Sequence, residues 1–106
     1  MPQYLFVYHG GHTPTDPAKV EATMAAWGAW FQNIGAALDI PGNPVGQSCT
    51  VSADGVADNG GANPASGFTV VKADSMDAAT EMAKGCPMVV NGSGSVEVAE
   101  VHEIEM

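Results

Sequence analysis

Aromatic and aliphatic residues alternate near the start of the chain, where residues 3–9 read QYLFVYH. Successive side chains of a strand point to opposite faces, so this alternation predicts a β-strand. Both faces of this strand would be mainly apolar, which is typical of a strand inside a sheet that is covered on both sides. One face carries Tyr4, Phe6 and Tyr8, and the other carries Leu5, Val7 and His9.

A helical pattern follows the first loop. Asp16 is a suitable N-cap, and Pro17 is a suitable first helical residue. The spacing of the apolar residues predicts a helix from Pro17 to about Leu38 that packs one face on a sheet. The apolar stripe consists of Val20, Met24, Trp27, Phe31, Ile34 and Leu38, and Trp30 broadens it.

The middle of the chain gives weaker signals. Residues 39–46 are rich in Pro and Gly and predict a turn. Residues 47–53, QSCTVSA, predict a weak strand, which we place at the sheet edge because it has few large apolar side chains. Residues 54–66 are polar and lack periodicity, so we expect a loop that joins the second and third strands.

A helix with signals at both ends is predicted over residues 74–87. Either Asp74 or Ser75 is suitable as its N-cap. Gly85 is suitable as a left-handed stop, and Pro87 forbids continuation of the helix.

Strands are predicted on both sides of this helix. Residues 67–73 read GFTVVKA, and residues 95–104 read SVEVAEVHEI. Neither face of the last strand is cleanly apolar. This predicts either a β-bulge near Ala99 or one strand end in a wet environment.

Together these elements predict an α+β fold, a ferredoxin-like βαββαβ chain in a single domain over residues 1–106. Such chains usually form a four-stranded antiparallel sheet in the order 4-1-3-2, with two helices on one face. The other face would then be bare, although the first strand is apolar on both sides. We expect a second copy to cover it, which makes a homodimer with a dimeric α+β barrel.

The charge balance limits the classes of partner. The formal net charge is −9, and the sequence contains three Lys and no Arg. A binder of nucleic acid or of an anionic membrane needs clustered cations, so neither partner is expected. The sequence contains no run of about 18 apolar residues, so no membrane span is predicted. The N-terminus lacks the basic region of a secretory signal. We therefore expect a cytoplasmic protein in which Cys49 and Cys86 are free thiols.

Four segments resemble the YCII-related family, including its DGPF-type members: MPQYLFVYHGG, AAWGAWFQNIG, FTVVKADSMDAATEMAKGCP and GSVEVAEVHEIEM. The resemblance covers nearly the whole chain and implies the dimeric α+β barrel. It also implies an enzymatic role, suggested in some members by a His–Asp pair, or an association with sigma-factor domains. Asp58 matches the Asp of the DGPF motif, whereas Asn59, Gly60 and Gly61 stand where Gly, Pro and Phe belong.

The predicted topology collects polar residues at one edge of the sheet. His9 is the candidate general base there, and Asp58 or Asp54 is its candidate carboxylate partner. His12 is a second candidate in the following loop. The competing interpretation is that His9 only bonds a backbone carbonyl at the end of its strand. Metal-binding motifs are absent from the sequence, and we expect no cofactor.

Two functions from different classes follow. The first is an enzyme-like domain that moves a proton on a small organic molecule without a cofactor. The second is a non-catalytic regulatory module of the sigma-factor-associated type that binds a ligand or a protein. Trp27, Trp30 and Phe31 either wall a ligand cavity or form a core or dimer surface.

Overall fold

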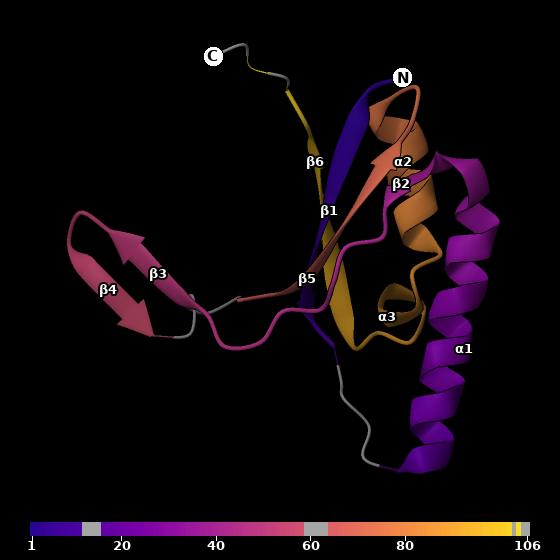
Figure 1. The fold of residues 1–106 in the computed structure, drawn as a ribbon, viewed down its shortest axis with the longest axis horizontal. Coiled ribbons are helices and arrows are strands. Elements are labelled where there is room, and N and C mark those ends of the chain that lie inside the picture. Colours follow the sequence, from indigo (N-terminus) through magenta and orange to yellow (C-terminus); the bar gives the residue numbers. More distant parts are fainter. Residues whose placement is uncertain (12–15, 59–63, 103, 105–106) are drawn as a thin grey trace.

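The structure is a computed structural model, and it describes residues 1–11, 16–58, 64–102 and 104. Helices α1, α2 and α3 lie on one side of a four-stranded sheet, and a small hairpin extends on the other side (Figure 1). The elements are β1 (Gln3–Gly10), α1 (Pro17–Ile34), a 3₁₀ turn η1 (Gly35–Ala37), β2 (Leu38–Ile40), β3 (Cys49–Ser52), β4 (Gly55–Asp58), β5 (Ala65–Lys72), α2 (Met76–Lys84), α3 (Pro87–Val90) and β6 (Gly94–Glu100).

The large sheet has the order β2-β5-β1-β6, and each neighbouring pair is antiparallel. β1 is a central strand, as predicted, with β5 on one side and β6 on the other. Tyr4, Phe6 and Tyr8 are buried beneath the helices, whereas Leu5 and Val7 are half-buried on the opposite face. The mixed α+β class predicted from the sequence is thus confirmed.

The edge strand was predicted in the wrong segment. β2 takes the edge beside β5, through the pairs of Leu38 with Val71 and Ile40 with Val70. Residues 49–52 pair with residues 55–58 in a separate two-stranded sheet instead. The two apolar side chains of β2 are better suited to the sheet than those of QSCTVSA, and a tight turn at Ala53 and Asp54 folds that segment onto itself.

α1 begins as predicted and ends earlier. The Asp16 carboxylate accepts a hydrogen bond of 3.0 Å from the Ala18 amide, and Pro17 opens the helix. The α-helix stops at Ile34 because Gly35 takes a positive φ of 58°. The first turns of the predicted stripe were also placed wrongly, since Val20 is 36% exposed and Met24 is 70% exposed. Only the later part of the stripe packs on the core.

α2 settles the choice of N-cap, because the Ser75 hydroxyl accepts a hydrogen bond of 3.1 Å from the Ala78 amide. Gly85 does not adopt the left-handed conformation that was predicted, since its φ is −83°. Glycine at this position instead leaves room for a neighbouring side chain. A Cβ on Gly85 would lie 3.3 Å from Cδ1 of Trp30, whose indole donates a hydrogen bond of 2.9 Å to the Met82 carbonyl.

β6 pairs with β1 without any shift of register, so no bulge interrupts that pairing near Ala99. The strand ends at Glu100, earlier than predicted. Val96 and Val98 pack against the core. Ser95 and Glu97, which alternate with them along the strand, are exposed. The mixed pattern of this strand therefore reflects one face against the helices and one face toward solvent.

The face of the sheet opposite the helices is here called the open face. No helix among the described residues covers it (Figure 1). It carries apolar side chains from three strands, because side chains paired directly across an antiparallel ladder share one face. Its apolar members include Leu5 and Val7 from β1, Phe68 and Val70 from β5, and Ala99 from β6, and His9 and Glu97 lie on the same face.

Candidate functional site

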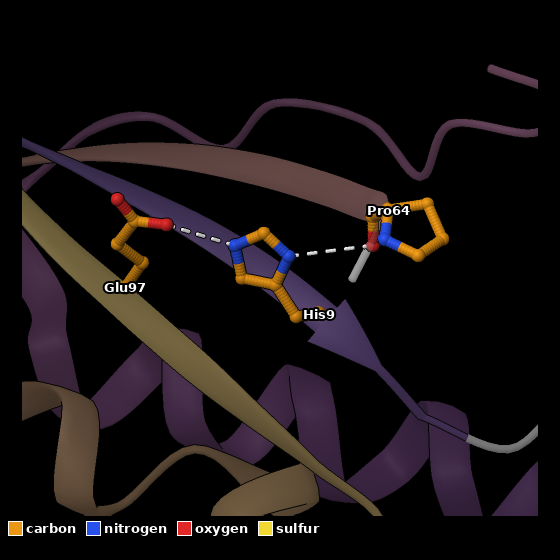
Figure 2. A network of polar contacts seen from close by, with 3 residues as sticks. All are labelled: His9, Pro64 and Glu97. Atoms are coloured by element: carbon orange, nitrogen blue, oxygen red, sulfur yellow. Dashed lines mark hydrogen bonds and ion pairs between the residues drawn. The ribbon is translucent and has the colours of Figure 1, made fainter. Parts of the chain in front are cut away.

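His9 lies near the end of β1, and within the described part of the chain its imidazole lies close to oxygen atoms of Glu97 and Pro64 (Figure 2). Nε2 lies 2.9 Å from Oε1 of Glu97 on β6, and Nδ1 lies 3.3 Å from the carbonyl oxygen of Pro64. The His9 side chain is 11% exposed, whereas that of Glu97 is 66% exposed. The site therefore combines a sheltered imidazole with a carboxylate that water reaches.

The two contacts favour a particular protonation state of His9. A carboxylate and a carbonyl both accept hydrogen bonds, and a neutral imidazole donates from only one nitrogen. Both contacts are therefore hydrogen bonds at the same time only when the ring is protonated. In that state the ring is a proton donor, and the Glu97 carboxylate stabilises its positive charge.

Strand register brings these groups together. Glu97 lies opposite Val7, so it is a diagonal neighbour of His9 on the same face of the β1–β6 ladder. On the other side of β1 the register shifts between Tyr8 and His9, and His9 lies opposite Ala65. This irregularity places Pro64 beside the imidazole, in hydrogen-bonding range of Nδ1.

The other predicted site residues lie elsewhere or outside the described part of the chain. Asp54 is in the turn of the β3–β4 hairpin, and Asp58 ends β4 opposite Cys49. Both aspartates are exposed. His12 lies outside the described residues, so its predicted role stays a prediction, as does a pairing of His9 with either aspartate.

Glu97 is the site residue that sequence reasoning missed. The carboxylate partner of His9 was predicted to be Asp54 or Asp58. Glu97 is instead on β6, 88 positions after His9 in the chain. One signal was available, because Glu97 is a charged residue on a strand face shared with Ala99. The backbone contact of the competing interpretation is present as well, at the Pro64 carbonyl.

The remaining reactive side chains are those of the two cysteines and His102. Cys86 has no exposed surface, and burial raises the pKa of its thiol, so it stays protonated and packs in the core. Cys49 is exposed, and both cysteines are free, as predicted. His102 contacts Glu100 at 3.1 Å, far along β6 from Ser95, the residue opposite His9.

The described residues contain neither a cluster suited to a metal ion nor a helix that could cross a membrane. No group of three or more His, Cys, Asp or Glu within residues 1–11, 16–58, 64–102 and 104 could hold a metal ion. No helix in the same part of the chain is long and apolar enough to cross a membrane.

The antiparallel sheet with helices on one face defines a mixed α+β protein, and a histidine–carboxylate pair lies on the opposite face of the sheet. The chain belongs to the YCII-related domain family, whose model matches residues 4–105. This match confirms the resemblance seen in the sequence.

A solved structure has a similar fold. A 5-chloro-2-hydroxyhydroquinone dehydrochlorinase from Burkholderia phenoliruptrix, in complex with 2,5-dihydroxybenzoquinone, is similar with a TM-score of 0.55 and 18% sequence identity. The similarity covers 92% of this chain and 93% of that chain, and at this identity it shows the fold alone. No curated protein sequence matches the chain.

Proposed function

We propose that the protein is an enzyme that transfers a proton on a small organic molecule, with His9 as the acid–base group. The contact of 2.9 Å between His9 Nε2 and Glu97 Oε1 carries this assignment. The imidazole is the group that exchanges protons near neutral pH, and the carboxylate orients it and stabilises its charged form. The reaction needs no cofactor, because proton transfer between carbon or oxygen and an imidazole is complete in itself.

Glu97 and Pro64 have different parts in this proposal. Glu97 is the more exposed partner, so its side chain is free to turn toward water when a substrate approaches Nε2. Meanwhile the Pro64 carbonyl oxygen holds the ring in place by accepting a hydrogen bond from Nδ1. His9 first donates a proton to the substrate and then, as a neutral base, takes one back.

The solved structural neighbour supports a choice of first substrates. The activity and the bound ligand of that protein concern hydroxylated hydroquinones and quinones. These rings interconvert between enol and keto forms by gaining or losing a proton at a ring carbon, which is the chemistry that an imidazole acid–base group accelerates. We propose this substrate class for the present protein.

The same chemistry allows a direct test without knowledge of the natural substrate. In D₂O, the ring C–H protons of 2,5-dihydroxybenzoquinone are replaced by deuterium, and NMR follows the rate. We expect the wild-type protein to accelerate this exchange and His9→Asn to lose about 100-fold or more of the acceleration. Glu97→Gln is expected to fall between them. Glu100→Gln is the matched control, because Glu100 lies on the same strand as Glu97 and contacts His102, which follows that strand.

Two results would contradict the proposed function. One is a wild-type protein that exchanges no faster than buffer, and the other is a folded His9→Asn variant that matches the wild type. Either result would favour the second candidate, a non-catalytic regulatory module that binds a ligand or a protein. The β3–β4 hairpin favours that candidate, because its paired residues Val51 and Val56 are 74% and 68% exposed.

We also propose that a second copy of the chain covers the open face. Five half-buried apolar residues from β1, β5 and β6 share this face, and a sheet face of this kind is normally buried. The hairpin flanks the same side of the sheet (Figure 1), and an isolated two-stranded hairpin is marginally stable in water without further contacts. A homodimer through this face would also shelter His9 further.

A further inference from the structure

A cavity of about 560 Å³ lies between α1 and the sheet, and Phe68 of the open face is also among its lining residues. Its aromatic walls come from α1 and β1, at Trp27, Phe31 and Tyr8. The segment from Pro41 to Pro44 forms another wall, beside β5. His9 and Glu97 are not among the residues that line it. The cavity is thus a compartment separate from the proposed proton-transfer site.

The way α1 lies on the sheet explains the empty space. Trp30 is the residue of α1 that is fully buried, and Phe6 and Cys86 beneath the helices have no exposed surface. Toward its start the helix loses this contact, and Met24 beside the cavity is 70% exposed. Glycines line the sheet side there, at Gly10 and Gly67, so no side chains fill the gap.

The polar side chains that the described residues contribute to the cavity are uncharged. The Tyr8 hydroxyl donates to Thr69 Oγ1 at 2.6 Å, and Thr69 donates to the Pro41 carbonyl at 2.8 Å. Burial raises the pKa of Tyr8 well above its usual range, against the opposing effect of the Thr69 hydrogen bond, so the phenol stays neutral. Its oxygen keeps lone pairs that accept a further hydrogen bond.

Ser66 supplies a group without a partner. Its Oγ is buried and makes no hydrogen bond within the described part of the chain, and Ser66 lines the cavity. A buried hydroxyl without a partner costs free energy, and a ligand with a matching donor or acceptor removes that cost.

Among the residues that the structure describes, none that lines the cavity is Asp, Glu, Lys or His, so these residues offer no counter-charge to an ionic ligand. An unpaired charge in such a place is strongly unfavourable. The walls favour flat rings instead. Trp27 and Tyr8 meet edge to face, with ring centroids 5.1 Å apart, and aromatic pairs of this kind accept a further ring readily. Met24 and Met88 add flexible side chains that adapt to different shapes.

From these observations we propose that the cavity is a binding site for a small, neutral aromatic molecule of one or two rings that carries a hydroxyl or similar polar group. The ring lies among Trp27, Phe31 and Tyr8, and the polar group bonds Ser66. The size is suitable, because small-molecule sites in proteins usually measure about 300–1,000 Å³.

The test compares two ligands of similar size and different charge, 2-naphthol and 2-naphthoate, at pH 7. Titration calorimetry and tryptophan fluorescence are expected to show saturable, one-to-one binding of 2-naphthol. The anionic 2-naphthoate is expected to bind at least tenfold more weakly. Equal affinities, or no saturable binding of 2-naphthol up to its solubility limit, would overturn the proposal.

Three variants locate the bound ring. Thr23→Phe places a large side chain in the cavity wall and is expected to abolish binding, whereas Val90→Phe adds the same side chain at an exposed position of α3 and is expected to change nothing. Ser66→Ala is expected to weaken 2-naphthol about fivefold and to leave naphthalene unaffected. Unchanged binding in a folded Thr23→Phe variant would place the ligand elsewhere and overturn the proposal.

His9→Asn separates this site from the proposed enzymatic one. Since His9 does not line the cavity, we expect this variant to bind 2-naphthol as the wild type does. A loss of binding in the folded variant would mean that the two compartments are one site, which would overturn the separation argued here.

Discussion

The thiol of Cys86 has no exposed surface, and burial raises its pKa. In the unfolded chain the thiol ionises at its ordinary value of about 8.5. Above that pH the unfolded chain binds fewer protons than the folded one, so the free energy of unfolding falls as pH rises toward the raised value. The contribution is fully present below the ordinary pKa. Tyr8 acts with the same sign at higher pH, because its pKa is also raised.

We therefore expect the wild-type protein to lose stability between pH 7 and pH 9.5, as measured by urea denaturation. Cys86→Ala is expected to be less stable at pH 7, because it leaves a small cavity, but to lose less between the two pH values. Cys49→Ala is the control, since Cys49 is exposed and should leave the pH dependence unchanged. A Cys86→Ala variant with the wild-type pH dependence would show that this thiol is not responsible.

At the scale of single elements, two glycines make opposite contributions. Gly28 is inside α1, is exposed, and has nothing within 4 Å of a Cβ added to it. Gly85 follows α2, and an added Cβ would press on the ring of Trp30 at 3.3 Å. One position thus has glycine at a cost in helix stability, and the other needs it for close packing.

Gly28→Ala is expected to raise the free energy of unfolding by about 0.5–1 kcal/mol, because Ala is the better helix former. Gly85→Ala is expected to lower it by about 1 kcal/mol or more, because the Trp30 ring must move. Urea denaturation of both variants beside the wild type measures the difference. The same sign in both would contradict the packing described for Trp30.

How far the sequence predicts these elements depends on how local their signals are. β1, β5 and the N-terminal ends of α1 and α2 follow from alternation and from neighbouring residues: Asp16 caps α1 as expected, and Ser75, one of the two expected candidates, caps α2. β2 was missed because it has only three residues and continues directly from η1. Its identity is decided by pairing with β5, which no local pattern reports.

The sequence likewise predicted only part of the candidate site. His9 was predicted from its place at the end of an apolar strand. Its contact with Glu97 depends on the register between β1 and β6, and the cavity depends on how α1 lies over the sheet. Both are consequences of packing between distant segments, so spacing along the chain predicted neither.

At the scale of the whole molecule, net charge and the open face act against each other. Each chain carries a formal net charge of −9, so two copies repel. The apolar residues of the open face favour association in spite of this repulsion. Salt screens the charges and leaves the apolar contact in place, so we expect the homodimer to be tighter at 0.5 M than at 0.02 M sodium chloride.

Sedimentation velocity at micromolar concentration tests the proposed interface. Val70→Lys places a charge in the middle of the open face and is expected to give monomers. Val90→Lys places the same charge on α3, where Val90 is 73% exposed, and is expected to leave the dimer intact. A wild-type protein that sediments as a monomer under both salt conditions would contradict the proposed homodimer.

His9 and Tyr8 are consecutive residues, yet they serve opposite sides of β1. A displacement of this strand by one position would exchange them, so that the imidazole entered the aromatic compartment and the phenol reached water. The end of the strand resists such a displacement, because Gly10 and Gly94 pair so closely that a Cβ on Gly94 would lie 2.5 Å from the His9 carbonyl oxygen. A single-residue insertion in β1 should therefore disable both compartments at once, although neither one touches the other.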